Sequence, residues 1–328
     1  MCSGNEAGAI DARPLMSSLG AQRAIAPANA AQAQARYFNS ANAFNVKLPV
    51  VPAHAFDDVA AAALGSGQTT GWHVCDQSAA LGSPSAATTP FMLARYAHIR
   101  QGQTLDAQFL ASGVLCFVIA GEGWSRTPRE TLNWQAGDLM FFAGGQPLVL
   151  GALSSQAVLW VVTDEPLYAF TKARPSTQPE EMLPTVQFKA GDIRHQLDLI
   201  HASRPDEGTS GLAVVFSSEA LQDGRNILPT LTLSLNSLPP RTDQSAHRHN
   251  SAALTLVVEG ENCHTRIEGQ AVGWQPWSTL VTPAAAAHSH HNAGNTRALF
   301  LIVQDGGLYY QGRTCLLYTS DAADDSLR

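Results

Sequence analysis

Two clusters of histidines lie in the second half of the chain. His247 and His249 are separated by one residue, and about forty residues further on the sequence reads HSHHN at 288–292. Residues two apart on a β-strand share one face and lie about 6 to 7 Å apart, so both imidazoles could bind one ion. A third imidazole from the later cluster would complete a ligand set for a divalent metal. A polar surface patch with fortuitous nickel affinity is the alternative interpretation.

The elements that must carry these histidines are predicted to be β-strands. Short runs rich in Val, Leu and Phe are separated by Gly, Pro, Asp and Asn, which is typical of strands joined by turns. A stretch beginning near residue 95 resembles one beginning near residue 231, with Gly121 matching Gly260 and Trp134 matching Trp274. This repeat predicts an all-β protein of two successive small barrels.

At the histidines the chain resembles the cupin superfamily. The first cupin motif contains HxH followed by an acidic ligand and a glycine, and the second reads PxGxxHxxxN. The residues that fit are His247, His249 and Gly260 in the first motif and Pro283, His288 and Asn292 in the second, with Ala285 in the glycine place. Ala253 and Leu254 occupy the place of the acidic ligand, and a site of three histidines is what the gentisate 1,2-dioxygenase group shows.

Within the superfamily the resemblance is to gentisate 1,2-dioxygenase and salicylate 1,2-dioxygenase-like proteins. The matching segments are HRHNSAAL, LVVEGEN and TPAAAAHSHHN, and they lie within residues 231–301. The resemblance implies two tandem cupin barrels, each a double-stranded β-helix or jelly roll. It implies Fe(II) held by His247, His249 and His288, and a catalytic His290 that hydrogen-bonds the substrate hydroxyl or bound oxygen. Zn, Ni and Mn are alternative metals, because imidazole ligands do not select among these ions.

The activity that the resemblance implies is ring cleavage by dioxygen. Three neutral imidazoles leave the 2+ charge of the ion uncompensated, which favours an anionic chelating substrate. The expected partners are therefore dioxygen and a hydroxylated aromatic carboxylic acid of the gentisate, salicylate or hydroxynaphthoate class. A metal-dependent cupin hydrolase, lyase or isomerase and a non-enzymatic metal-binding bicupin are the alternatives.

One position departs from the family pattern. Thr255 stands where the family has an arginine that pairs with the substrate carboxylate, and a threonine cannot supply the charged fork of a guanidinium. Arg266 and Arg241 are the candidate replacements. His264 and Arg266 share one strand face that either lines the barrel beside the substrate or is solvated. Thr255, His264, Arg266 and His290 are the predicted substrate contacts.

The first copy of the repeat lacks ligands. Gln108, Leu110 and Leu148 stand where the histidines would be, so this barrel is expected to be structural. The predicted organisation is a low-complexity arm at 1–36, helical or disordered, an N-terminal barrel at 37–195, a C-terminal metal-binding barrel at 196–314 and a tail at 315–328. The tail contains LLYTSDAADD, which resembles translated sequencing adapter in metagenomic reading frames and is expected to be non-native.

Composition narrows the remaining possibilities. The chain has 328 residues, a net charge of -7 and 45% hydrophobic residues, which argues against binding to nucleic acid or to an anionic membrane. Without a leader or an apolar span, a cytoplasmic protein is expected. The five cysteines are scattered and never form CxxC, so they predict neither disulfides nor a zinc knuckle. A homo-oligomer, either a dimer or a tetramer, is expected.

Overall fold

The computed structural model describes residues 13–43, 46–204, 211–314 and 317–319, in two units, Met1–Pro49 and Val50–Arg328. The first unit contains β1 (Gln22–Arg23), α1 (Ala30–Gln34) and β2 (Arg36–Tyr37) after a 3-10 turn at Met16–Ser18. Strands β1 and β2 pair antiparallel. The Asn29 side chain accepts a hydrogen bond from the backbone of Gln32 and caps α1. The arm is thus partly helical, and its unit extends to Pro49 rather than to residue 36.

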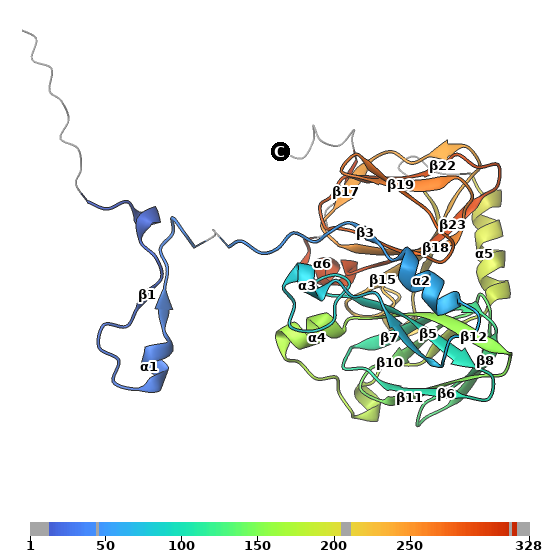
Figure 1. The fold of residues 1–328 in the computed structure, drawn as a ribbon, viewed down its shortest axis with the longest axis horizontal. Coiled ribbons are helices and arrows are strands. Elements are labelled where there is room, and N and C mark those ends of the chain that lie inside the picture. Colours follow the sequence, from blue (N-terminus) through green and yellow to red (C-terminus); the bar gives the residue numbers. More distant parts are fainter. Residues whose placement is uncertain (1–12, 44–45, 205–210, 315–316, 320–328) are drawn as a thin grey trace, which may run out of the picture. The chain divides into compact units, whose positions relative to one another are not determined.

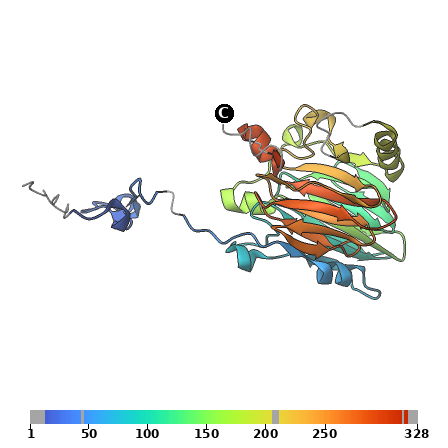
Figure 2. The same ribbon diagram turned by 90° about the horizontal axis from the view of Figure 1, so that it is seen from above.

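The second unit contains the two predicted barrels, which are stacked in Figures 1 and 2. Two antiparallel sheets form the first barrel. The larger sheet has the order β13 (Val186–Phe188), β10 (Leu139–Ala143), β7 (Gly113–Ala120), β12 (Gln156–Thr163), β5 (Leu93–Arg100) and β4 (Gly71–Val74). The smaller sheet has the order β6 (Thr104–Gln108), β11 (Pro147–Ala152), β8 (Glu122–Arg126) and β9 (Thr131–Gln135).

The second barrel repeats this plan. Its first sheet has the order β14 (Leu212–Phe216), β15 (Thr232–Leu238), β23 (Ala298–Gln304), β18 (Ala253–Glu259), β21 (Thr279–Thr282) and β3 (His54–Ala55). Its second sheet has the order β20 (Gln270–Gly273), β19 (Cys263–Ile267), β22 (His288–Asn292), β17 (His247–His249) and β24 (Leu317–Thr319), with β16 (Thr242–Asp243) beside β22. The predicted architecture of two tandem β-barrels is confirmed. Strand β3 comes from the chain segment before the first barrel, yet it pairs with β21 of the second.

Helices lie outside the barrel sheets. They are α2 (Asp57–Leu64), α3 (Ser78–Leu81), α4 (Glu165–Thr171), α5 (Ala190–Ala202) and α6 (Gly306–Gly312), with 3-10 turns at Pro179–Glu181 and Glu219–Leu221. Among the described residues, no helix combines the length and the apolar character needed to cross a membrane.

One apolar core joins the two barrels. Leu115 and Trp160 of the first barrel belong to the same buried cluster as Leu254 and Leu301 of the second. Polar contacts cross the same interface, because the Trp160 Nε1–H donates to Thr279 Oγ1 at 2.9 Å. The inner faces of the barrels form two separate clusters. Each central strand therefore buries one face inside its own barrel and the other against its partner barrel.

Strand pairing corrects one expected equivalence between the copies. Leu148 pairs with Ala107 in the first barrel, just as His288 pairs with His247 in the second. The residue equivalent to His247 is therefore Ala107, and the expectation for Gln108 is wrong by one residue. Neither side chain offers an imidazole.

The same shift applies to the second ligand position. Phe109 and Gly121 are 12 residues apart, whereas His249 and Gly260 are 11 apart. An alignment that matches the glycines is therefore wrong by one residue upstream of them. His249 corresponds to the buried Phe109 and not to Leu110, which is 45% exposed.

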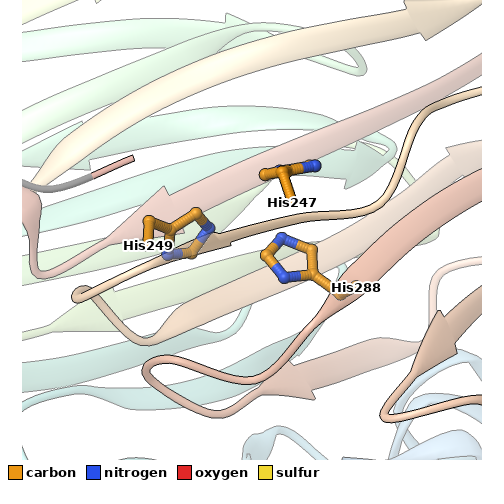
Figure 3. Close-up of side chains that lie close together, drawn as sticks. All are labelled: His247, His249 and His288. Atoms are coloured by element: carbon orange, nitrogen blue, oxygen red, sulfur yellow. The ribbon is translucent and has the colours of Figure 1, made fainter. Parts of the chain in front are cut away.

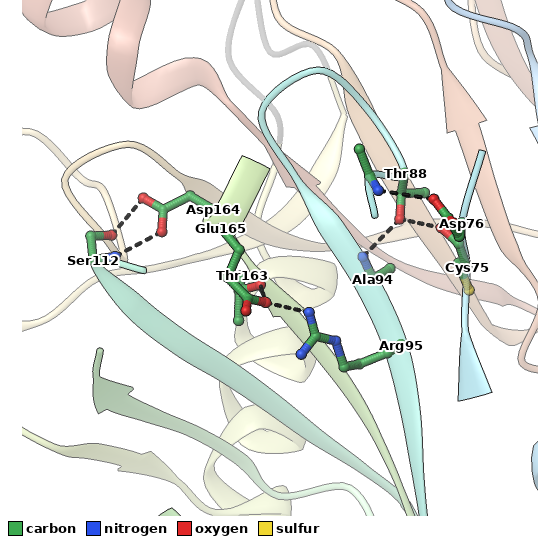
Figure 4. Close-up of polar contacts among 10 residues, drawn as sticks. Cys75, Asp76, Thr88, Ala94, Arg95, Ser112, Thr163, Asp164 and Glu165 are labelled. Carbon is green, nitrogen blue, oxygen red and sulfur yellow. Dashed lines mark hydrogen bonds and ion pairs between the residues drawn. The ribbon is translucent and has the colours of Figure 1, made fainter. Parts of the chain in front are cut away.

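Side chains fill the interior of the first barrel where the second barrel has its histidines. Arg95 forms an ion pair with Glu165 and lies over the ring of Phe109, with its guanidinium carbon 4.8 Å from the ring centre (Figure 4). The strand registers place Arg95 at the position that Ser234 has in the second barrel. The interior of the first barrel is therefore filled by an aromatic ring and an ion pair, which agrees with a structural role.

An aspartate at the same position in each barrel accepts a hydrogen bond from the backbone. Asp164 follows β12 and accepts hydrogen bonds from the backbone N–H and hydroxyl of Ser112, at 2.8 and 2.7 Å (Figure 4). Asp305 follows β23 and accepts one from the backbone N–H of Ala252 at 2.8 Å. Both carboxylates thus satisfy the backbone at the start of a central strand. Burial raises the pKa of both carboxyl groups, that of Asp305 to about 7.

Candidate metal centre

Three histidines converge inside the second barrel. His247 and His249 lie on β17 and His288 on the neighbouring β22, where His247 and His288 are directly paired. One nitrogen from each ring lies within 4.8 Å of the others. The ring centres are 4.3 to 5.8 Å apart, and the rings face a common point in Figure 3. Ligands at about 2.0–2.1 Å from one ion lie no more than about 4.2 Å apart, so the rings would have to move slightly closer together to hold an ion.

Backbone carbonyls fix the orientation of all three rings. The Nδ1–H groups donate to the carbonyl oxygens of residues 245, 251 and 286, at 3.2, 2.8 and 2.9 Å for His247, His249 and His288 respectively. A carbonyl oxygen can only accept, so Nδ1 carries the proton in each neutral ring. Nε2 is then the nitrogen of each ring that could bind a metal. Such outer hydrogen bonds are the usual means of fixing the tautomer of a metal-binding histidine.

Burial keeps the rings of His249 and His288 neutral. Burial lowers the pKa of His288 to about 3, and it also lowers the pKa of His249. Protonation would put a charge into a poorly solvated interior next to other imidazoles. Metal binding requires the neutral ring. His249 and His288 are therefore in the form that can bind a metal at neutral pH.

His290 lies on the same face of β22 as His288 but takes no part in the triad. It is 3% exposed, its ring centre is 6.0 Å from that of His288, and it packs against Phe300. Its Nδ1 lies 2.9 Å from Thr265 Oγ1. The same oxygen accepts a hydrogen bond from the Trp274 indole N–H at 2.8 Å. Burial lowers the pKa of His290 well below its usual value. The ring is thus a neutral, fixed group beside the triad.

A glutamine on the opposite sheet also reaches the triad. The Gln304 side-chain amide donates to His249 Nε2 at 3.0 Å. Gln304 ends β23, whose Ala298, Phe300 and Ile302 pack in the interior cluster of the barrel. Residues two apart share a strand face, so the sequence LFLIVQ carries a signal for an inward-facing amide at 304, but this residue was not among the sequence predictions.

The remaining predicted contacts lie on two different strands and in a loop. Thr255 lies on β18 and is 1% exposed, and its hydroxyl has no hydrogen-bond partner in the described part of the chain. On β19, Thr265 is buried while His264 and Arg266 lie on the opposite face, where His264 stacks on His291 at 4.6 Å. Arg241 is exposed and donates to Asn295. Neither Arg266 nor Arg241 faces the histidines from the inner side of its sheet.

Part of the expected tail pairs with the ligand strand. In β24, residues 317–319 pair antiparallel with 249–247 of β17. Residues 315–316 and 320–328 lie outside the described residues. The tail segment therefore forms the edge of the sheet that carries two of the three histidines, and its non-native origin stays a prediction.

Comparison with known proteins agrees with this fold and site. A family model described as "Cupin domain" matches residues 234–304. A gentisate 1,2-dioxygenase from Streptomyces sp. is 41% identical over 64 residues, which cover 20% of this chain and 18% of that protein. A 5-aminosalicylate 1,2-dioxygenase from Comamonas sp. is 24% identical over 263 residues, which cover 70% of this chain and 68% of that protein. In the first two curated relatives the match spans 18% and 41% of their length.

The fold also matches solved structures. The salicylate 1,2-dioxygenase of Pseudaminobacter salicylatoxidans superposes with a TM-score of 0.69 at 13% identity, covering 87% of this chain and 92% of that one. The same dioxygenase has been solved with gentisate. The chain has two barrels, and its residues 234–304 match the cupin-domain family model. It resembles the gentisate and salicylate 1,2-dioxygenases, which are ring-cleaving enzymes, in both sequence and structure.

Proposed function

We propose that the protein is a non-haem Fe(II) dioxygenase that cleaves the ring of a hydroxylated aromatic carboxylic acid. The observation that carries this proposal is the triad of His247, His249 and His288, in which one nitrogen of each ring lies within 4.8 Å of the others. The relatives named as gentisate, aminosalicylate and hydroxynaphthoate dioxygenases support the reaction class.

The donor set fits a divalent iron. Imidazole nitrogen suits Fe(II) as well as Zn, Ni and Cu, and the three histidines, which come from two adjacent strands, would hold such an ion. When bound, iron would bring the aromatic substrate and dioxygen together on one centre. Neutral ligands leave its charge to be balanced by an anionic substrate, which favours a hydroxy-carboxylate.

We infer that His290 presents an N–H to the substrate. The Trp274 indole can only donate to Thr265 Oγ1, so the Thr265 hydroxyl proton is left for His290 Nδ1, its other neighbour. Nδ1 then accepts, and the ring proton sits on Nε2. A neutral ring in this tautomer holds a hydrogen bond to a substrate oxygen without carrying charge itself.

Oxygen uptake tests the proposal directly. The protein is reconstituted anaerobically with Fe(II), its metal content is measured, and oxygen consumption is followed with gentisate, salicylate and 1-hydroxy-2-naphthoate. His249→Ala is expected to lose both the iron and the oxygen uptake. His291→Ala is the matched control, because His291 lies on the same strand as His288 but hydrogen-bonds Asp243 near the surface. Iron binding without oxygen uptake for any of the three acids would contradict the proposal.

A further inference from the structure

A cavity of about 550 Å³ lies beside the triad. Gln304 forms part of its wall, and the same side chain contacts the metal-facing nitrogen of His249. Thr232 and Ser234 of β15 add to the wall. They alternate with Leu233, which packs in the core between the barrels, so they face the interior of the second barrel. The cavity is therefore connected to the triad through Gln304, which lines the cavity and contacts His249.

The outer wall of this cavity contains a cation. Arg225 lies in the loop after the 3-10 turn at Glu219–Leu221 and lines the cavity together with Asp223. Arg225 forms no ion pair with any residue that the structure describes. Its guanidinium is thus available to an anion that enters the cavity.

The first barrel shows why the cavity exists. Arg95 occupies the position equivalent to Ser234, and with Glu165 and Phe109 it fills the corresponding space. In the second barrel the small Ser234 leaves that space open. The arginine on this side comes from the 219–225 loop instead of from the strand.

We propose that Arg225 binds the carboxylate of the aromatic substrate while the triad side of the cavity receives its hydroxyl group. This inference rests on the proposed function and names the residue that supplies the charge missing at Thr255. A guanidinium binds a carboxylate through two parallel hydrogen bonds. Arg266 and Arg241 are excluded from this role because neither faces the cavity.

Anaerobic binding measurements test the assignment without turnover. Salicylate and salicylamide are titrated calorimetrically into the Fe(II)-loaded protein, because the amide keeps the ring and the hydroxyl but removes the charge. Arg225→Gln is expected to weaken salicylate binding roughly tenfold to a hundredfold, as expected for losing hydrogen bonds to a charged group. Salicylamide binding should change less than about twofold. Arg225→Lys should retain part of the preference, and Asp223→Asn should strengthen salicylate binding.

Arg266→Gln is the matched control, since it removes a guanidinium from the outer face of β19. The assignment is overturned if Arg225→Gln weakens both ligands equally, if it weakens neither, if Arg266→Gln produces the selective loss, or if the parent protein binds both ligands equally. Selective loss in Arg225→Gln without oxygen uptake by the parent would support the carboxylate site and contradict the dioxygenase reaction. The two proposals can therefore fail separately.

Discussion

The ligand histidines are oriented by the backbone that surrounds them. Each Nδ1–H donates to a carbonyl two residues away in sequence, so the local chain conformation sets the tautomer. Sequence spacing indicated two ligands on one strand and a third from the later cluster, and the family resemblance selected His288. HxH on a strand and a histidine on the adjacent strand carry both the ligands and their supporting carbonyls.

Other site residues could not be read from the sequence in the same way. Gln304 comes from the facing sheet, and its approach to His249 depends on how the two sheets stack. Arg225 lies in a loop with a left-handed backbone, φ 52°, where no periodicity indicates direction. Thr265 contacts His290 through strand pairing, and a strand register is not visible in a single sequence.

Removing the Thr265 hydroxyl tests the tautomer of His290. Thr265→Val is expected to lower kcat by roughly tenfold or more, within the range typical of a positioned proton-transfer or hydrogen-bonding group, with unchanged metal content. In the Zn-substituted protein, ¹⁵N spectra should show the Nε2–H form for His290 in the parent and a mixture in the variant. Thr265→Ser should restore both properties.

Ser125→Ala is the control for this experiment. Trp134 donates to Ser125 in the first barrel at 2.8 Å, as Trp274 does to Thr265, but no histidine is attached there. Both variants should lose a similar stability, about 1–3 kcal/mol for an indole left without its acceptor. An equal loss of kcat in Ser125→Ala would show that the effect is structural.

At the scale of elements, equivalent residues of the two barrels are identified by strand pairing and not by counting residues from a shared glycine. The sequence predicted the repeat from its glycine and tryptophan positions, and the barrels confirm it. It misplaced Ala107 and Phe109 because one residue is inserted between these positions and Gly121 relative to the second copy. The strand–aspartate–helix closure after β12 and β23 was not foreseen, because a single aspartate before a short helix is a weak signal.

The closing aspartate of the second barrel makes stability depend on pH. The pKa of Asp305 is raised to about 7 by burial, so the folded state binds its proton more tightly than the unfolded chain does. The stability that this proton gives is present below pH 4 and is lost as pH rises through 7. The upper limit of this contribution to the free energy of unfolding is ~4 kcal/mol, because the pKa is 3.8 in the unfolded chain and about 7 in the folded protein.

Asp305→Asn should remove this dependence, because the amide oxygen still accepts from Ala252 but does not ionise. Urea unfolding of the metal-free protein at pH 5 and pH 8 measures the difference. The free energy of unfolding of the parent should fall relative to that of the variant as the pH rises. Parallel pH dependence in the two proteins would show that Asp305 does not titrate in this range.

At the scale of the whole molecule, the shared core makes the first barrel a structural partner of the second. Trp160 is fully buried and donates to Thr279 across the interface. The first barrel, which lacks the histidines, thus supports the second. Thr279 lies on β21, and β21 pairs with β18 in the barrel that carries the triad. The first copy of the repeat therefore has a structural role even though it lacks the ligand histidines.

Trp160→Ala should destabilise both barrels together. A cavity of this size in a core costs about 3–5 kcal/mol, and calorimetry should show one unfolding transition that moves to lower temperature. Phe170→Ala is the control, because Phe170 is 75% exposed and should leave the transition in place. Two separate transitions, only one of which moves, would contradict a shared cooperative core.

Strand β3 gives the chain a particular order of events during synthesis. Ala55 pairs with Leu280, so the ribosome adds 225 residues after Ala55 before Leu280 is in the chain. At about 5–20 residues per second this takes roughly 11–45 seconds. Once Phe188 has been added, the first barrel is complete in sequence, but β3 still lacks the strand with which it pairs. The second barrel therefore acquires β3 only after Leu280 has been added.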